Sequence, residues 1–200
     1  MMKYLKGTRK LVLRLEASKC NFLKWYVDAS YTVHKDMKSH TGGMLTMGKG
    51  AVCGISKKQK LNTKSSTESE LVGVEDVLPQ VLWTNYFMKD HGWHTNHSVV
   101  FQDNKSAILL EQNGKLSSSN RTKHINVRYF FIKDCIERKE VKIEFLGTDE
   151  MVADYFTKPL QGTKFIKFCN QIMNIDKNIE TNIDDDINDG DEGIDHVERS

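Results

Sequence analysis

Four acidic residues stand at the ends of predicted helices and strands, each beside an apolar run: Asp28, Glu70, Asp103 and Asp154. Carboxylates that a fold brings together repel one another, and they cannot all stay ionised without a counterion. Oxygen ligands without a cluster of cysteine and histidine favour Mg²⁺, with Mn²⁺ as the alternative ion. Two such ions about 4 Å apart would activate a water molecule and stabilise the leaving oxygen in phosphodiester hydrolysis.

Spacing along the chain does not show by itself that these carboxylates converge. Taken singly, an acid at the end of an element is more often a helix cap or a solvated surface group than a ligand. In open α/β sheets, however, sites form at the carboxyl ends of strands, and Asp28 and Asp103 both stand near such ends. The arrangement of the elements therefore decides between the two interpretations.

The longest predicted helix begins with two overlapping S/T-x-x-E patterns, Ser65 with Glu68 and Thr67 with Glu70. Only one pattern can cap the helix, so the other glutamate is free for different chemistry. On a helical wheel Glu70 lies in line with Val74 on the flank of the buried stripe, whereas Glu68 lies on a mixed face. We therefore predict that Glu68 is part of the cap and that Glu70 is the acid of the site.

The order of the predicted elements is that of an α/β domain. Apolar runs predict strands over residues 23–29, 41–47, 51–56, 97–103 and 141–146. Helical spacing and capping residues predict helices over residues 66–90, 105–111, 121–140, 149–157 and 165–173. Three successive strands followed by alternating helices and strands imply a mixed five-stranded sheet flanked by helices.

Three local expectations accompany this order. Pro79 lacks a backbone donor, which predicts a kink in the long helix. Asn104 and Thr148 are predicted to cap the helices that follow them. The leucine-containing residues 1–19 look helical, and they are set apart from the main domain, residues 20–175.

The net charge is distributed unevenly along the chain. The whole chain carries +2, but residues 176–200 hold ten acidic and two basic residues. Their net charge is therefore −8, which leaves +10 on residues 1–175. A basic body favours an anionic partner, nucleic acid first, with a solvated lysine-rich surface as the alternative. The acidic tail has little to bury and is predicted to be disordered.

Several other classes of site are disfavoured by pattern. Four scattered cysteines and seven histidines without metal-ligand spacing argue against a zinc site or a disulfide framework, and for a reducing compartment. The Asp-rich run at residues 184–190 lacks the closing glutamate of an EF-hand. Neither a signal peptide nor a membrane span is expected, because no apolar segment of suitable length occurs.

Six local motifs follow one another along the chain. They are Val27-Asp28-Ala29-Ser30, Lys38-Ser39-His40-Thr41-Gly42-Gly43, Ser65-Ser66-Thr67-Glu68-Ser69-Glu70, Gln102-Asp103-Asn104-Lys105-Ser106-Ala107, Arg121-Thr122-Lys123-His124-Ile125-Asn126-Val127-Arg128-Tyr129 and Ala153-Asp154-Tyr155-Phe156-Thr157-Lys158-Pro159-Leu160. Together they resemble the ribonuclease H region at the end of copia-type retrotransposon Pol polyproteins, over roughly residues 3–173. Residues 4–8 resemble the end of the connection after the reverse transcriptase, so we interpret residues 1–19 as its remnant.

The resemblance implies a ribonuclease H-like fold that cuts the RNA strand of RNA–DNA hybrids during reverse transcription. It assigns the family's four acids to Asp28, Glu70, Asp103 and Asp154, with two Mg²⁺ ions as cofactors and Mn²⁺ as the alternative. The implied partners are the hybrid and the reverse transcriptase portion of the polyprotein, with no membrane. The implied location is a cytoplasmic virus-like particle, with passage to the nucleus left open and the oligomeric state undetermined.

The sequence departs from the family pattern at several points. The loop at residues 147–150 has no histidine, although cellular relatives carry one there that assists product release. His124 lies one helix earlier, and both a catalytic role and a helix-surface or nucleic-acid contact remain open for it. Ser30 replaces an acid found in many members, which leaves the four-acid set intact. The polymerase, integrase and protease regions do not occur in these 200 residues, and the acidic tail is not part of the family pattern.

Recognition of a hybrid is expected to rely on A-form-like shape, 2′-hydroxyl groups and phosphates. The candidates for contact with the nucleic acid are Lys57, Lys58, Lys60, Lys64, Lys105, Arg121, Lys123 and His124. Each of these side chains could equally be solvated.

Two other functions fit parts of the sequence. A catalytically silent, truncated or domesticated fragment would at most bind nucleic acid or protein, and a lone module loses the tether that holds it on substrate. An integrase or resolvase of similar sheet topology is disfavoured, since the helix acid Glu70 comes second in chain order rather than last. The intact set of four acids favours the nuclease.

Overall fold

The computed structural model describes residues 8–9, 11–17, 22–93, 97–113 and 123–175. The predicted nucleic-acid contact Arg121, the predicted loop at 114–120 and the acidic tail lie outside these residues. The side chains of Lys123 and His124 also lie outside the described part, although both residues begin a helix. Within the described part, no helix is both long and apolar enough to cross a membrane.

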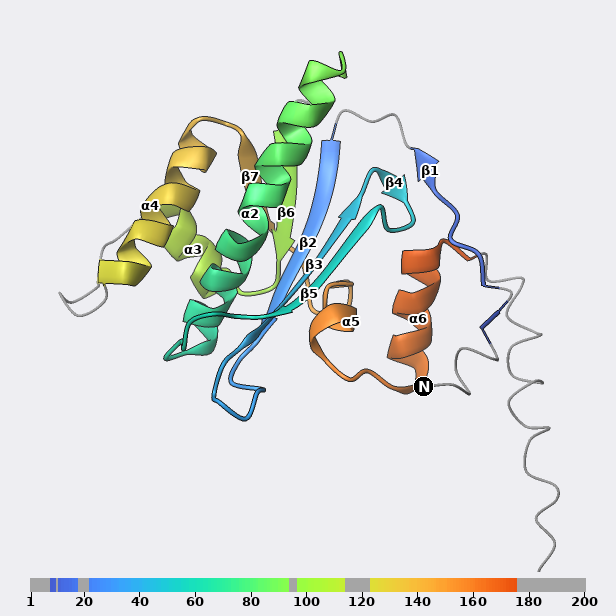
Figure 1. Ribbon diagram of the computed structural model, residues 1–200, viewed down its shortest axis with the longest axis horizontal. Coiled ribbons are helices and arrows are strands. Elements are labelled where there is room, and N and C mark those ends of the chain that lie inside the picture. The colour runs from blue at the N-terminus through green and yellow to red at the C-terminus, as the bar shows by residue number, and fades with distance from the viewer. Residues whose placement is uncertain (1–7, 10, 18–21, 94–96, 114–122, 176–200) are drawn as a thin grey trace, which may run out of the picture.

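Five strands form one mixed sheet, as the sequence predicts. They are β2 (Phe22–Ser30), β3 (His40–Thr46), β5 (Cys53–Lys58), β6 (His97–Gln102) and β7 (Val141–Phe145). Their order across the sheet is β5-β3-β2-β6-β7 (Figure 1). β2, β3 and β5 pair antiparallel, whereas β6 runs parallel to β2 and β7 runs parallel to β6. The carboxyl ends of β2, β6 and β7 therefore meet at one edge of the sheet.

Helices cover both faces of this sheet (Figure 1). They are α2 (Ser66–Asp90), α3 (Lys105–Asn113) and α4 (Lys123–Glu137) on one face, and α5 (Asp154–Thr157) and α6 (Gly162–Met173) on the other. Alternate residues of a strand point to opposite faces. Trp25 and Val27 accordingly belong to the main apolar cluster beneath α2, whereas Tyr26 packs against the smaller cluster around Phe168 of α6.

The start of α2 agrees with the prediction that Glu68 is part of the helix cap and that Glu70 is not. Ser65 is the N-cap residue, and its side-chain oxygen accepts a hydrogen bond from the backbone N–H of Glu68 at 3.1 Å. The carboxylate of Glu68 accepts in turn from the backbone N–H of Lys64 at 2.7 Å. Glu70 is buried on the sheet-facing side. α2 continues through Pro79 as one helix.

The predicted cap at Asn104 is confirmed, because its side chain accepts from the backbone N–H of Ala107 at 3.1 Å. The predicted cap at Thr148 is wrong. The segment after β7 forms turns, and α5 begins only at Asp154 without a side-chain cap. The Thr148 hydroxyl donates instead to Asp103, at 2.8 Å, so a tertiary partner replaces the local one.

The helical prediction for the N-terminal segment is also wrong for the residues that are described. Residues 11–15 have no regular structure, and β1 (Glu16–Ala17) pairs with β4 (Gly48–Lys49) in a two-stranded sheet. The backbone N–H of Arg14 donates to the carbonyl of Met173 at 3.0 Å. The backbone of this segment therefore runs beside the end of α6, and its described residues form no helix.

Gly42→Ala is expected to lower the free energy of unfolding by about 1–3 kcal/mol, because the added methyl group would overpack a close contact. Gly42 lies opposite Asp28 in the sheet, and its added Cβ would lie 2.6 Å from Thr157 Cγ2 and 2.8 Å from the carbonyl oxygen of Ala153. The control is Gly147→Ala, whose Cβ would meet nothing within 4 Å. Urea unfolding of both variants measures the difference, and equal stabilities would contradict the close packing of α5 on β3.

Candidate metal centre

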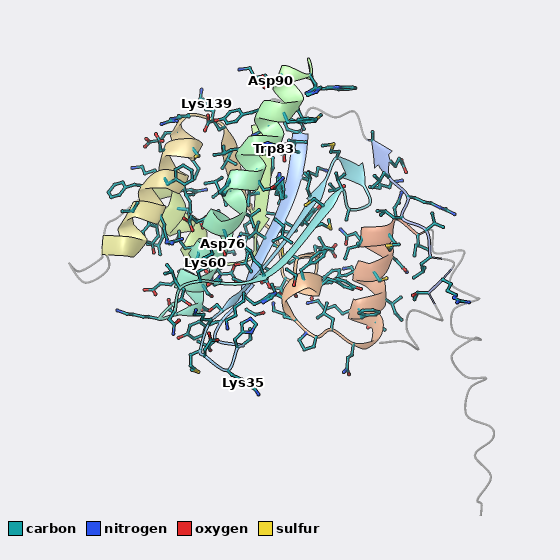
Figure 2. The ribbon with its side chains drawn as sticks, in the orientation of Figure 1. Lys35, Lys60, Asp76, Trp83, Asp90 and Lys139 are labelled. Atoms are coloured by element: carbon teal, nitrogen blue, oxygen red, sulfur yellow. The ribbon has the colours of Figure 1, made fainter. Side chains whose placement is uncertain are left out.

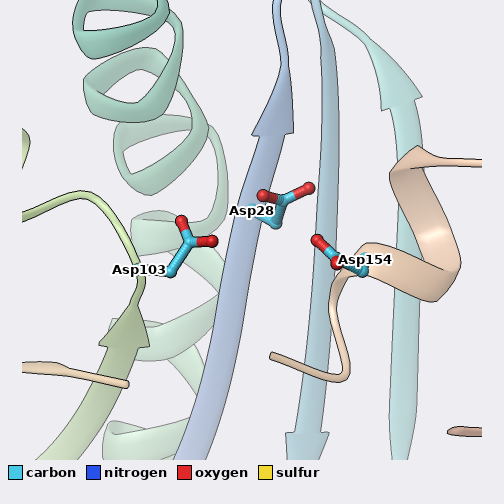
Figure 3. A group of neighbouring side chains, drawn as sticks. All are labelled: Asp28, Asp103 and Asp154. Carbon is cyan, nitrogen blue, oxygen red and sulfur yellow. The ribbon is translucent and has the colours of Figure 1, made fainter. Parts of the chain in front are cut away.

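Three aspartates from separate elements converge at one edge of the sheet (Figure 3). Asp28 belongs to β2, Asp103 follows the last residue of β6, and Asp154 is the first residue of α5. One carboxylate oxygen from each lies within 4.8 Å of the other two. Figure 3 shows the three carboxylates turned toward a common space. Three of the four acids singled out from the sequence are thus brought together by the fold.

The backbone explains why α5 can deliver Asp154 to the sheet. Asp28 pairs with Gly42 across β2 and β3, and Gly42 has no side chain to hold α5 away. The hydroxyl of Thr157, one turn after Asp154, donates a hydrogen bond to Asp28. β2 and α5 are therefore joined at the site by close packing and by a hydrogen bond to the buried carboxylate.

Glu70 lies beside the three aspartates but is not one of the groups whose oxygens fall within that 4.8 Å set. It is 5% exposed, and Gln102 Nε2 donates to its Oε2 at 3.4 Å. Burial raises the pKa of Glu70 well above its usual range, and the charges of Asp28 and Asp103 raise it further. The charges of those two aspartates therefore act on Glu70, which lies outside the set of three.

Asp28 experiences opposing influences. Burial raises the pKa of its carboxyl group, Lys158 and the Thr157 hydroxyl oppose that rise, and the charges of Asp154 and Asp103 add to it. The net effect is a raised pKa, so the ionised form of Asp28 is disfavoured in the fold. A cation placed among these carboxylates would relieve this cost.

Two lysines contact Asp154. Lys158 Nζ lies 2.5 Å from Asp154 Oδ1, and Lys164 Nζ lies 2.7 Å from its Oδ2. Lys158 Nζ also lies 3.4 Å from Asp28 Oδ1. Neither lysine was singled out from the sequence. The i,i+4 spacing of Asp154 and Lys158 was a signal for that ion pair, whereas nothing in the local sequence pointed to Lys164.

The donor set fits a hard divalent cation. Its ligand atoms are all carboxylate oxygens, which Mg²⁺ and Mn²⁺ prefer. Asp28 is 1% exposed and Asp154 is 0% exposed, so water does little to offset their charges. The cluster can therefore hold a metal ion, and Asp28, Asp103 and Asp154 would be its ligands, with Glu70 adjacent.

The predicted nucleic-acid contacts differ in their surroundings. Lys57 is engaged with Asp76, at 3.5 Å from its carboxylate, and Lys58 with Asp36 at 2.7 Å. Lys60 and Lys64 are exposed between β5 and α2, and Figure 2 labels Lys60. Lys105, two residues after Asp103 in the sequence, is exposed. Its ammonium group lies 4.5 Å from the centre of the Phe145 ring.

One more buried carboxyl group, that of Glu111, lies outside the cluster of three aspartates. Glu111 of α3 is 0% exposed, and no hydrogen-bond partner within the described part of the chain satisfies either of its oxygens. Burial raises its pKa well above the usual range, and the polar side chain of Gln102 opposes the rise. Gln102 donates a hydrogen bond to Glu70, so the same amide influences both buried acids. Glu111 was not predicted to be buried, because its position in the sequence is that of an ordinary helix residue.

Glu111→Gln is expected to raise the free energy of unfolding at pH 8 and to change it much less at pH 4. Above the pKa of an unfolded-state glutamate the unfolded chain ionises while the buried group stays protonated, so stability falls with pH until the folded-state pKa is reached. Each unit of pKa elevation contributes about 1.4 kcal/mol to this loss, and glutamine does not titrate. Urea unfolding at both pH values tests this; a stability difference independent of pH would contradict it.

Two curated relatives match most of this chain. The retrovirus-related Pol polyprotein from transposon TNT 1-94 of Nicotiana tabacum is 33% identical over 179 residues, which is 89% of this chain and 13% of that protein. The one from transposon RE1 of Arabidopsis thaliana is 30% identical over 174 residues, 86% of this chain and 12% of that protein. The chain thus spans about an eighth of the length of these relatives. No protein-family model matches.

Among solved structures, LC11-RNase H1, isolated from compost by a metagenomic approach, aligns over 68% of this chain and 92% of that chain. The TM-score is 0.48 and the sequence identity is 12%. The mixed five-stranded sheet flanked by helices that the sequence predicts is the architecture of this chain.

Proposed function

Since this chain belongs to the family of retrovirus-related transposon Pol polyproteins, of which it spans one region, we propose that it is a copia-type ribonuclease H. Its substrate would be the RNA strand of an RNA–DNA hybrid made during reverse transcription. The observation that carries this proposal is the convergence of Asp28, Asp103 and Asp154, with one oxygen of each within 4.8 Å of the others. Converging carboxylates with raised pKa values at Asp28 and Glu70 are more easily explained by catalysis than by folding.

In this proposal Asp28, Glu70, Asp103 and Asp154 would hold two Mg²⁺ ions. When bound, the ions supply activation of water and charge stabilisation at the leaving oxygen. The chain's own groups hold the ligands in place: Thr157 donates to Asp28 and Thr148 donates to Asp103 at 2.8 Å. These hydrogen bonds fix the direction of two carboxylates before substrate arrives.

The substrate would lie across the sheet edge where the acids converge. Lys105 follows Asp103 at the start of α3, and Lys57 and Lys58 end β5, two strands away from β2. We propose that these lysines, together with Lys60 and Lys64, contact phosphates of the hybrid. The same proposal includes Arg121, Lys123 and His124, and it includes the reverse transcriptase portion of the polyprotein as the partner that holds the module on its substrate.

The test is strand-specific cleavage. The protein is incubated with Mg²⁺ and an RNA–DNA hybrid labelled on each strand in turn, with DNA duplex and single-stranded RNA as comparison substrates. The proposal predicts cleavage of the RNA strand of the hybrid alone, loss of cleavage in EDTA, and loss of cleavage in the Asp103→Asn variant.

Other outcomes are equally informative. Equal cleavage by the unmodified protein and Asp103→Asn would indicate a contaminating nuclease and would contradict the proposal. Binding of the hybrid without cleavage would favour the catalytically silent binding module instead.

A further inference from the structure

Lys158 lies immediately after α5, and its ammonium group is directed into the acid cluster. Its Nζ is 2.5 Å from Asp154 Oδ1 and 3.4 Å from Asp28 Oδ1. The side chains of Asp154 and Asp28 are 1% and 2% exposed, whereas that of Lys158 is 38% exposed. One flexible cation therefore reaches from the surface to two buried carboxylates.

Lys164 also contacts the cluster, but through one aspartate rather than two. Lys164 Nζ contacts Asp154 Oδ2 at 2.7 Å, which is the oxygen that Lys158 does not contact. Among the ion pairs in the described part of the chain, Asp28 pairs with Lys158. Lys158 is thus the cation that joins two of the three aspartates, while Lys164 neutralises one of them from the side.

The charge of Lys158 lies at oxygens of two proposed metal ligands, Asp154 Oδ1 and Asp28 Oδ1. An ammonium group and a divalent cation would both bind the same carboxylate oxygens. Two cations that share ligand atoms at such short range repel each other strongly. Contact of the Lys158 ammonium group with these oxygens must therefore weaken the binding of a divalent cation, and the reverse.

We propose that Lys158 is an internal counterion, which neutralises Asp28 and Asp154 in the metal-free protein and is displaced from them when a divalent cation binds. This inference rests on the proposed function, because it takes the acid cluster to be a metal site. Displacement frees an ammonium group beside the ions, 38% exposed even before it moves. Lys158 therefore stabilises the folded acid cluster when metal is absent, and its competition with the metal ion weakens metal binding.

Calorimetric titration of the intact protein with Mn²⁺ tests the competition. Lys158→Met keeps the aliphatic stem and removes the charge, so Mn²⁺ should bind on the order of tenfold more tightly, within the usual range of coupling between competing ligands. In EDTA the same variant should unfold at a lower temperature than the unmodified protein, and saturating Mn²⁺ should raise its melting temperature more. The control is Lys167→Met, whose ammonium pairs with Glu150 at 2.6 Å outside the cluster. It should leave the Mn²⁺ affinity unchanged.

A second measurement uses the unmodified protein and does not depend on the folding of a variant. Brief acetylation with limiting reagent, read by mass spectrometry, should label Lys158 several-fold faster in saturating Mg²⁺ than in EDTA, because displacement frees the amine. Labelling of Lys167 should not change. Equal labelling of Lys158 in both conditions would overturn the inference.

The two proposals fail in different ways. If Mn²⁺ binds the unmodified protein and Lys158→Met with equal affinity, or binds the variant more weakly, the counterion role is wrong and the metal site stands. If neither protein binds Mn²⁺, the metal site itself is wrong, and the proposed function falls with it.

Discussion

Glu70→Gln is expected to reduce the rate of hybrid cleavage by on the order of a hundredfold to a thousandfold, the scale seen when one preorganised charge-stabilising group is removed. Glu70 is 5% exposed, and the charges of Asp28 and Asp103 raise its pKa. Glutamine keeps the shape of the side chain but cannot supply a negative charge. The measurement is the initial rate of RNA-strand cleavage at saturating Mg²⁺.

Glu68→Gln is the matched control, two residues earlier on the same helix. Glu68 closes the helix start by accepting from Lys64, while Ser65 accepts from its backbone N–H. Its replacement should leave the cleavage rate within about twofold and cost at most about 1 kcal/mol in the free energy of unfolding. Loss of activity in Glu68→Gln with activity kept in Glu70→Gln would mean that the wrong glutamate has been assigned to the site.

Asp28→Asn is expected to abolish detectable cleavage while raising the free energy of unfolding in EDTA. The folded-state pKa of Asp28 is raised, so its ionisation costs stability at every pH above the unfolded-state pKa. Asparagine removes that cost and part of the repulsion with Asp154 and Asp103. Loss of activity with a gain in stability distinguishes a functional residue from a structural one.

Guanidinium unfolding in EDTA at pH 7.5 measures this gain, with the cleavage rate measured in parallel. The control is Asp134→Asn, which removes an exposed carboxylate that pairs with Arg138 on α4 at 2.6 Å. That variant should keep full activity and nearly unchanged stability. An Asp28→Asn protein that is both inactive and markedly less stable in EDTA would contradict the idea that the acids repel one another in the metal-free fold.

The sheet was predictable from the sequence because its strands carry strong local signals. Alternation in residues 23–29 and the apolar run at 97–103 match β2 and β6 closely. The assignment of Glu68 to the cap was also predictable, because capping is a local interaction within one turn. The convergence of the acids followed from the rule that the carboxyl ends of parallel strands share an edge.

The failures have a common cause, which is that long-range partners replaced local ones. Thr148 has the sequence signature of a helix cap, yet its hydroxyl donates to Asp103, 45 residues earlier. Lys164 reaches Asp154 only because α6 packs beside α5, and no local pattern records that packing. Glu111 reads as a surface helix residue, but α4 and β7 cover α3 and bury it.

The central claim is that Asp28, Asp103 and Asp154 form one metal centre with Glu70 beside them. The most direct test is the anomalous diffraction of crystals of this protein grown with Mn²⁺. The account predicts strong anomalous peaks among these carboxylates, which disappear in crystals of Asp28→Asn. Crystals in which Mn²⁺ is absent from this cluster, or is bound only elsewhere, would contradict it.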